Sequence, residues 1–322
     1  MSRALVARAP TRLDFGGGWT DVSPYCEEQG SAVCNVAITR YATATVATGA
    51  RAAVESSDPL VRAALQRSGL AHATASVTSD FPIGSGLGGS SAAGVALAGA
   101  LAALSGEHLE PGALAESSRR TEVDELGVPG GYQDHYASAY GGGLLLTYDR
   151  GVSVERLALS DATCAAIARR GLLVYTGVSR MSASTITAVS DAYRERDRGV
   201  CAALGRMKSL AMEMAAALRA GDLDALGEQM SEHWVHQRAL HPTITTERIE
   251  AIGREAARAG ALGVKALGAS AGGCVLVIAR SGREEQLSRA LAPFGERLDF
   301  AVDRGGFEVV AVMDERRETD DQ

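Results

Sequence analysis

Lysine is almost absent from this chain. Of its 32 basic residues, Lys208 and Lys265 are lysines and all the others are arginines. A Walker-type phosphate loop needs a lysine directly after its last glycine, and no glycine-rich stretch here has one, so that class of nucleotide site is excluded. The formal net charge of −7 and the isoelectric point near 5.5 also argue against nucleic acid as the main partner.

Paired cysteines and long apolar runs are missing too. The five cysteines form no C-x-x-C pair and no regular spacing, which indicates reduced thiols. The longest apolar run, residues 92–104, is interrupted by glycine and too short to span a bilayer. The first ten residues lack an apolar core followed by a cleavage site. We therefore expect a cytoplasmic protein with no membrane partner.

The chain is long for one domain. With 322 residues, 46% of them hydrophobic, two packed domains are expected. Alternating residues predict strands, and apolar residues at helical spacing predict helices. Strands are expected at 4–9, 32–38, 41–48, 73–79, 172–176, 273–279 and 307–312, a hairpin at 141–148, and helices at 59–69, 111–126, 183–218, 222–237, 246–260 and 284–293. A helical middle followed by strand, helix and strand indicates an α+β second domain, with domains at 1–165 and 166–322.

The run from Pro82 to Gly94 is rich in glycine and serine and leads into an apolar segment. Glycine lets the backbone curl and approach a ligand closely. A turn that opens a helix also presents unpaired N–H groups and the positive end of the helix dipole. Since a predicted strand precedes the run and a predicted helix follows it, we interpret it as a phosphate-binding loop rather than a flexible linker.

Three other segments carry candidate chemistry. Residues 8–21 combine arginine, aspartate, three glycines and Trp19, and carboxylates can accept hydrogen bonds from vicinal sugar hydroxyls. Residues 122–135 place several carboxylates around a Pro-Gly-Gly turn, as phosphoryl transfer requires for a metal ligand and a base. Residues 267–275 form a turn of small residues before a strand. Read singly, each segment could also be a surface turn.

The histidines are weaker candidates. His135 could serve as an alternative base, but a histidine beside a turn is more often structural. His233 and His236 are separated by three positions on a predicted helix, whereas a zinc site prefers four and needs a third ligand. We therefore expect surface or interdomain histidines here and no zinc.

Taken together, the segments resemble those of the GHMP small-molecule kinases, which include galactokinase, homoserine kinase and mevalonate kinase. Residues 82–93 are similar to the family's phosphate loop, 8–21 to its N-terminal motif and 267–275 to its C-terminal glycine motif. The sequences of residues 8–21 and 129–142 are most similar to those of D-glycero-D-manno-heptose 7-phosphate kinases. The resemblance implies a two-domain α+β fold, with an N-terminal domain like ribosomal protein S5 domain 2 and a ferredoxin-like C-terminal domain.

The resemblance also implies roles for individual residues. Asp134 matches the base that acts on the sugar hydroxyl, and Arg12 a cation that stabilises the transferred charge. Ser91 and Glu122 match the ligands of Mg²⁺. The residues expected to bind ATP are Gly84, Gly86, Leu87, Gly88, Gly89, Ser90, Ser91 and Gly272, and those expected to bind substrate are Thr20, Asp21, Gly131, Arg180 and Lys265, with Arg238 a weaker candidate.

The expected reaction is ATP- and Mg²⁺-dependent phosphorylation of the anomeric hydroxyl of a heptose 7-phosphate. Two departures leave the acceptor open: Trp19 replaces a small residue, and Gly268–Gly273 reads Gly-Ala-Ser-Ala-Gly-Gly in place of a nearly pure glycine run. Gly-Trp-Thr-Asp also occurs in fucokinase-like members, so another sugar or a small alcohol is an alternative. A non-catalytic sugar or nucleotide sensor is the alternative from another class. The expected partner is a small-molecule sugar or sugar phosphate, and a homodimer stays open.

Overall fold

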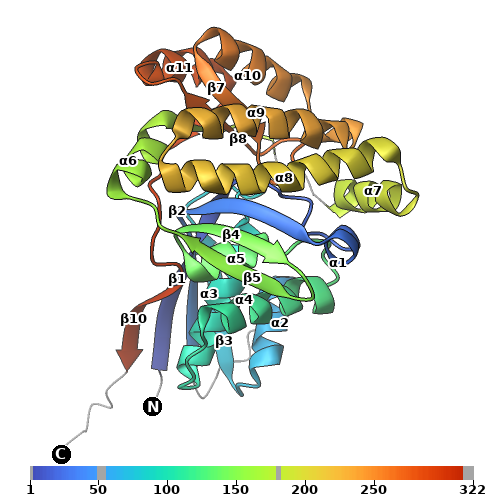
Figure 1. Cartoon of the computed structure of the whole chain (residues 1–322). Helices are drawn as coiled ribbons and strands as arrows, with labels where there is room; N and C mark the ends of the chain where they lie inside the picture. The colour runs from blue at the N-terminus through green and yellow to red at the C-terminus, as the bar shows by residue number, and fades with distance from the viewer. Residues whose placement is uncertain (1–2, 49–55, 179–182, 315–322) are drawn as a thin grey trace, which may run out of the picture.

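The computed structural model describes residues 3–48, 56–178 and 183–314. They form two sheets with helices packed between and around them (Figure 1). Among these residues, no helix is both long enough and apolar enough to cross a membrane.

The first sheet has six strands among the described residues, in the order β10-β1-β2-β4-β5, with β3 also paired to β2. All neighbouring strands are antiparallel. The long strand β2 pairs with β4 through residues 31–36 and with β3 through residues 42–48, so it carries two partners along its length. The strands are β1 (Arg3–Gly16), β2 (Ser31–Thr48), β3 (Ala73–Ser79), β4 (Gly143–Tyr148), β5 (Val152–Leu157) and β10 (Glu308–Asp314).

Helices pack against both faces of this sheet along β1. Leu5, Ala7 and Ala9 of β1 pack into a cluster with helices α2 (Pro59–Ser68), α3 (Gly89–Leu104), α4 (Pro111–Arg119) and α5 (Gln133–Tyr140). After a register shift between Pro10 and Thr11, Leu13 and Phe15 pack against α8 (Arg198–Ala220) and α9 (Leu223–Ala239). The end of β1 therefore lies between two halves of the molecule. The N-terminal half contains the first sheet and α2–α5, and the C-terminal half contains α8, α9 and the second sheet.

In the described part of the chain, the second sheet has four antiparallel strands, in the order β7-β8-β6-β9. Helices α8 and α9 lie between the two sheets, and α10 and α11 lie beyond the second sheet (Figure 1). The strands are β6 (Gly171–Tyr175), β7 (Ala261–Ala266), β8 (Cys274–Ala279) and β9 (Glu296–Leu298), and the remaining helices are α1 (Tyr25–Gln29), α6 (Asp161–Arg170), α7 (Ala183–Arg194), α10 (Glu247–Arg258) and α11 (Glu284–Leu291).

Several elements differ from the sequence prediction. The strands expected at 32–38 and 41–48 are one continuous strand, β2. The segment 183–218 is two helices, because Asp197 caps a new helix by accepting a hydrogen bond from Val200 N at 2.9 Å. The segment 111–126 is α-helical only to Arg119 and continues as a π-helix over Arg120–Glu125. The strand expected at 307–312 does not belong to the second sheet, because β10 pairs with β1 at the edge of the first.

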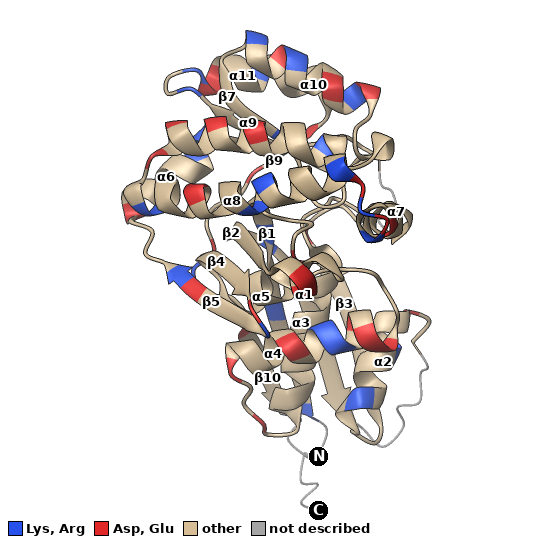
Figure 2. Cartoon of the chain, turned by 45° about the vertical axis from the view of Figure 1, so that its right-hand side comes forward, with Lys and Arg blue, Asp and Glu red and all other residues tan. Residues whose placement is uncertain are grey.

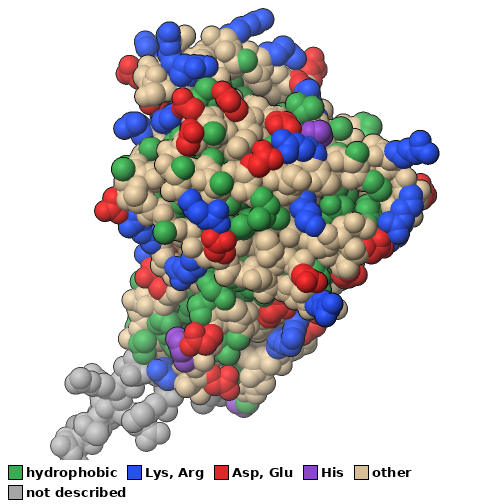
Figure 3. Space-filling model, viewed as in Figure 1, with side chains coloured by type: hydrophobic (Ala, Val, Ile, Leu, Met, Phe, Trp, Pro, Cys, Tyr) green, Lys and Arg blue, Asp and Glu red, His purple; other side chains and the backbone are tan. Residues whose placement is uncertain are grey.

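Charged residues lie mainly on helices and loops, while the strands are largely free of them (Figure 2). On the face seen in Figure 3, acidic and basic side chains are interspersed, with no large patch of one sign. Ion pairs such as Arg194–Asp191, Arg219–Glu155 and Arg238–Glu250 are partly or largely exposed, and exposed pairs contribute little to stability.

Candidate functional site

A cavity of about 660 Å³ is lined by residues from both halves of the molecule. This size is typical of sites for small molecules. Its wall comes from β1 and the turn after it, from residues 77–91 and 122–135, and from Ala183, Ile186, Gly268 and Ala269. Leu60, Val77, Phe81 and Ile83 make part of this wall apolar.

Glycine shapes the loop at residues 84–88. Gly84, Gly86 and Gly88 have φ angles of 71°, 75° and 76°, where a residue with a Cβ is strained. A Cβ on Gly86 would also lie 2.6 Å from the Leu267 carbonyl oxygen, so the two glycine-rich loops pack directly together. Gly88 is the N-cap of the 16-residue helix α3, whose first turn lines the cavity. The unpaired N–H groups of that turn can bind phosphate.

Two residues of the expected ATP set do not line the cavity. The Leu87 side chain is fully buried in the core, and its carbonyl oxygen accepts a hydrogen bond from Arg12 N at 3.1 Å. A Cβ on Gly272 would lie 2.5 Å from the Val178 carbonyl oxygen. The other six residues of the expected set line the cavity.

Ser91 and Glu122, the expected Mg²⁺ ligands, lie together in the cavity wall. Ser91 Oγ donates a hydrogen bond to Glu122 Oε2 at 2.9 Å. Glu122 lies in the π-helical segment, and π-helical turns are frequent at functional sites. Since Mg²⁺ prefers oxygen ligands and keeps several waters or phosphate oxygens, these two donors fit it. No three histidine, cysteine, aspartate or glutamate side chains within the described part of the chain converge as a metal site of their own.

His135 supports the Glu122 carboxylate. Its Nε2 lies 3.4 Å from Glu122 Oε2, and its Nδ1 is 3.0 Å from Ser118 Oγ. Burial lowers the pKa of His135 to about 4. The ring is therefore neutral at neutral pH, and its contacts are those of a group that holds Glu122 in place.

Asp134 faces the phosphate loop from the first turn of α5, where the helix dipole favours a carboxylate. Its Oδ1 forms an ion pair with Arg12 Nε at 2.7 Å, and a Cβ on Gly88 would lie 2.9 Å from its Cγ. Arg12 Nη1 also donates to the Gly86 carbonyl oxygen at 2.7 Å. Burial raises the pKa of Asp134, and the Arg12 charge opposes that rise. Arg12 thus ties the carboxylate to the loop.

Asp21 lines the same cavity. Its side chain is buried, and its Oδ2 accepts a hydrogen bond from Gln133 N at 3.1 Å. Burial raises the pKa of Asp21 to about 7, although the Gln133 hydrogen bond opposes the rise. A Cβ on Gly131 would overlap the Asp21 carboxylate, so only glycine lets the turn at 129–131 pack this closely.

The neighbours of Asp21 differ in their exposure to the cavity. Thr20 is fully buried and does not line it, because its hydroxyl donates to the Gly17 carbonyl oxygen at 2.7 Å. Trp19 does line the cavity, with a φ of 80° that is unusual for a bulky residue. Thr20 therefore stabilises the turn that presents Trp19 and Asp21.

Two family models match the chain: the GHMP kinases N terminal domain over residues 51–142 and the GHMP kinases C terminal domain over residues 214–296. Together they span more than half of the sequence. The chain belongs to the GHMP kinases. Members of this family use ATP as the phosphate donor.

Similar proteins include kinases of different sugars. A galactokinase of Mycobacterium tuberculosis is 31% identical over 242 residues, which cover 66% of this chain and 66% of that protein. The D-glycero-alpha-D-manno-heptose 7-phosphate kinase of Campylobacter jejuni is 25% identical over 321 residues, 90% of this chain and 93% of that one. This GHMP kinase thus spans just under two thirds of the galactokinase and nearly all of the heptose kinase.

A solved structure supports the fold. The D-glycero-D-manno-heptose 1-phosphate kinase from Bacteroides thetaiotaomicron superposes with a TM-score of 0.76 at 22% identity, over 98% of this chain and 100% of that one. The α+β two-domain GHMP kinase fold expected from the sequence is therefore confirmed.

Lys265 and Arg180 were expected to bind substrate. In this GHMP kinase Lys265 does not line the cavity, because its fully buried ammonium group donates to Asp14. The expected contact with substrate therefore does not match its position. Arg180 lies outside the described residues. Arg238 forms a surface ion pair with Glu250 at 3.2 Å.

Several residues that line the cavity were not predicted from the sequence, among them Asp14 and Gln133. Asp14 lies two positions after Arg12 on β1, so both side chains leave the strand on the same face. That spacing was a readable signal. Gln133 lies next to Asp134, and its amide N–H holds Asp21.

The histidines of α9 have structural contacts. His233 is fully buried, and its Nε2 accepts a hydrogen bond from Gly17 N at 2.9 Å. Burial lowers its pKa well below the ordinary value, so the ring is neutral. The interdomain role expected for it in place of zinc binding is therefore supported by its contact across the two halves.

Proposed function

We propose that this GHMP kinase transfers the γ-phosphoryl group of ATP to a hydroxyl group of a sugar. One observation carries the proposal: the Asp134 carboxylate, held by Arg12, packs against Gly88 at the start of α3. A base next to a phosphate-binding loop is the arrangement that phosphoryl transfer to a hydroxyl requires.

At the phosphate end, the amides of Gly88–Ser91 bind phosphate oxygens, and the apolar wall at Leu60, Val77 and Phe81 suits a purine base. Ser91 and Glu122 would hold Mg²⁺, which supplies positive charge to the phosphate oxygens as negative charge develops. His135 keeps Glu122 oriented through the contact at 3.4 Å.

At the acceptor end, Asp134 accepts the proton of the attacking hydroxyl. The hydroxyl oxygen forms a bond to the γ-phosphorus, the bond from that phosphorus to the bridging oxygen breaks, and ADP leaves. Arg12 stabilises the carboxylate and the charge on the transferred group. Asp21 accepts hydrogen bonds from other hydroxyls of the sugar.

For the acceptor we propose the anomeric hydroxyl of D-glycero-D-manno-heptose 7-phosphate. Support comes from the similarity to the Campylobacter heptose kinase, which extends over 90% of this chain. Among the described residues that line the cavity, Arg12 is the single lysine or arginine, and Asp134 and Gly86 already engage it. The sugar phosphate therefore requires a further cation, and Arg180 is our candidate.

A second candidate acceptor is a sugar without a phosphate group. The described cavity wall carries five carboxylates, from Asp14, Asp21, Asp58, Glu122 and Asp134, and these suit hydroxyl groups better than a second phosphate. The cytoplasmic location and the homodimer stay predictions.

The test is ADP release measured over a panel of free and 7-phosphorylated sugars. Asp134→Asn should lower kcat by about 10²–10⁴-fold, since it removes the base while ATP binding stays near normal. Asp149→Asn, at a side chain 95% exposed, is the matched control. Undiminished turnover by Asp134→Asn would remove Asp134 from the mechanism. No turnover with any acceptor would favour the sensor.

A further inference from the structure

A buried ion pair joins the two halves of the molecule behind the cavity. Lys265 Nζ, from β7, lies 2.7 Å from Asp14 Oδ2 and 2.8 Å from the Asp14 carbonyl oxygen of β1. The side chains are 0% and 2% exposed. Burying each ion costs several kcal/mol, which only a close partner offsets. Loss of either charge would therefore leave the other buried without its partner.

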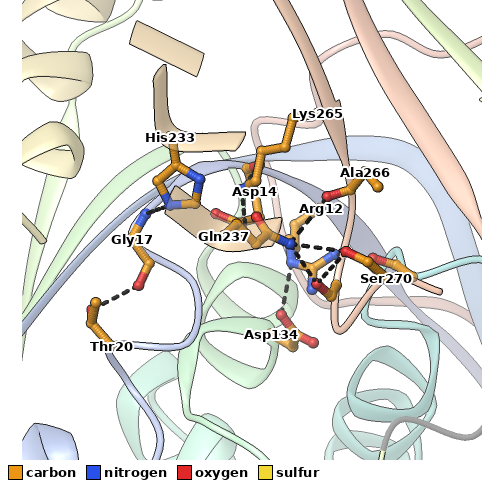
Figure 4. A network of polar contacts seen from close by, with 12 residues as sticks. Arg12, Asp14, Gly17, Thr20, Asp134, His233, Gln237, Lys265, Ala266 and Ser270 are labelled. Carbon is orange, nitrogen blue, oxygen red and sulfur yellow. Dashed lines mark hydrogen bonds and ion pairs between the residues drawn. The ribbon is translucent and has the colours of Figure 1, made fainter. Parts of the chain in front are cut away.

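This pair lies beside the catalytic one. Arg12 and Asp14 are two positions apart on β1 and share one face of the strand. Arg12 pairs with Asp134 at 2.7 Å. Figure 4 shows Lys265, Asp14, Arg12 and Asp134 in succession, so the signs of the four charges alternate from β7 to α5.

The alternation separates two carboxylates that compete for one cation. The Asp14 charge raises the pKa of Asp134 and also that of Asp21. Asp14 Oδ1 is buried and has no hydrogen-bond partner among the described residues. Without Lys265, the Asp14 carboxylate would attract Arg12, which would then turn from Asp134 and from the Gly86 carbonyl oxygen.

We propose that Lys265 is a positioning residue, which neutralises Asp14 and so keeps Arg12 directed at Asp134 and the phosphate loop. The inference rests on the proposed function, because Asp134 is the base there. Lys265 touches neither nucleotide nor sugar, and it acts through Asp14. Lys265 in the C-terminal half thus influences Asp134, the base in the N-terminal half, through Asp14 and Arg12.

Other titratable groups face this network from each element packed against it. Burial makes His233, His135 and Cys34 neutral, since it lowers the pKa of the two rings and raises the pKa of the thiol. The carboxylates of Asp21 and Glu122 face the same cavity. Those groups stay in place in the variants below, so a difference between variants reports Lys265 and Asp14.

The experiment is kcat as a function of pH for Lys265→Met, Asp14→Asn and the double variant. Lys265→Met should lower kcat by about 10–100-fold, because displacing a catalytic group costs that much, with KM for ATP retained. The acidic limb of its kcat–pH profile, where Asp134 takes up a proton, should move to higher pH by at least about 0.5. Without the positive charge of Lys265, the negative charge of Asp14 is no longer offset and raises the pKa of Asp134. Asp14→Asn should move that limb to lower pH. The double variant should restore much of kcat and bring the limb back.

Lys208→Met is the matched control, because Lys208 lies on α8, donates to the Gln29 carbonyl oxygen at the end of α1 and does not line the cavity. Its pH profile should equal that of the wild type. If folded Lys265→Met keeps the acidic limb of the wild-type pH profile, the inference about Lys265 is overturned, while the proposed function is unaffected. If that variant does not fold, the pH profile of Asp14→Asn is the test. An acidic limb that stays at the wild-type pH or moves to higher pH in Asp14→Asn overturns the inference. A wild type without turnover on any acceptor would overturn the proposed function and this inference with it.

Discussion

The raised pKa of Asp21 predicts a pH dependence of folding stability. Burial moves this pKa from 3.8 to about 7, so between these values the folded protein holds a proton that the unfolded chain has lost. Stability must then fall as pH rises through this interval, by about 1.4 kcal/mol per pH unit. Over the whole interval the loss reaches at most about 4 kcal/mol, and above it the loss is complete. Asp21→Asn removes this titration, so its stability should fall less steeply.

The assay is urea unfolding of the wild type and Asp21→Asn between about pH 4 and pH 7, with the difference in unfolding free energy plotted against pH. That difference isolates Asp21, because other carboxyls titrate in both proteins. Asp149→Asn, at a side chain 95% exposed, should follow the wild type. Parallel curves for the wild type and Asp21→Asn would refute the raised pKa.

Two further changes test the walls of the cavity. Gly131→Ala should lower kcat/KM for the sugar, because its Cβ would overlap the Asp21 carboxylate. Gly130→Ala is the control and should be tolerated, because its Cβ would meet its nearest atom only at 4.0 Å. Equal kinetics of the two variants would contradict the packing of Gly131 against Asp21. Glu122→Gln should raise the Mg²⁺ concentration needed for half-maximal activity by about 10-fold or more, since an amide is a weaker ligand than a carboxylate. Thr121→Ser is its control, and an unchanged Mg²⁺ dependence would exclude Glu122 as a ligand.

Elements with local signals were predictable from the sequence. The helix at 59–68 has both ends marked, because Asp58 accepts hydrogen bonds from Leu60 and Val61 and Gly69 ends it in the left-handed conformation. The break before α8 had a signal too, Asp197 at its N-cap, but the apolar spacing on both sides concealed it. No local signal indicated that β10 pairs with β1, since its partner residues, Arg3–Arg8, lie about 300 positions away in the sequence.

The same division holds for the cavity. Ser91, Glu122, Asp134 and Asp21 each lie in a short motif whose turn directs the side chain, and the structure brings all four to one wall. Thr20 and Leu87 belong to the same motifs but point into the core. Which of two neighbouring residues faces a ligand depends on the packing behind the turn, and a sequence motif does not contain that information.

Lys265 shows the limit most clearly. The resemblance to the heptose kinases implies that Lys265 binds the sugar phosphate, yet its partner is a carboxylate 251 positions away in the other sheet. The charge balance of the cavity explains why this matters. The described wall holds five carboxylates and Arg12 as its single lysine or arginine, so uncompensated negative charge would repel ATP and draw Arg12 from Asp134. Lys265 offsets Asp14 from behind the wall, and a metal on Ser91 and Glu122 would offset the phosphates from within it. An arginine at 265 would need room for a planar group where the ammonium is fully enclosed, so lysine is the cation that this buried position accommodates.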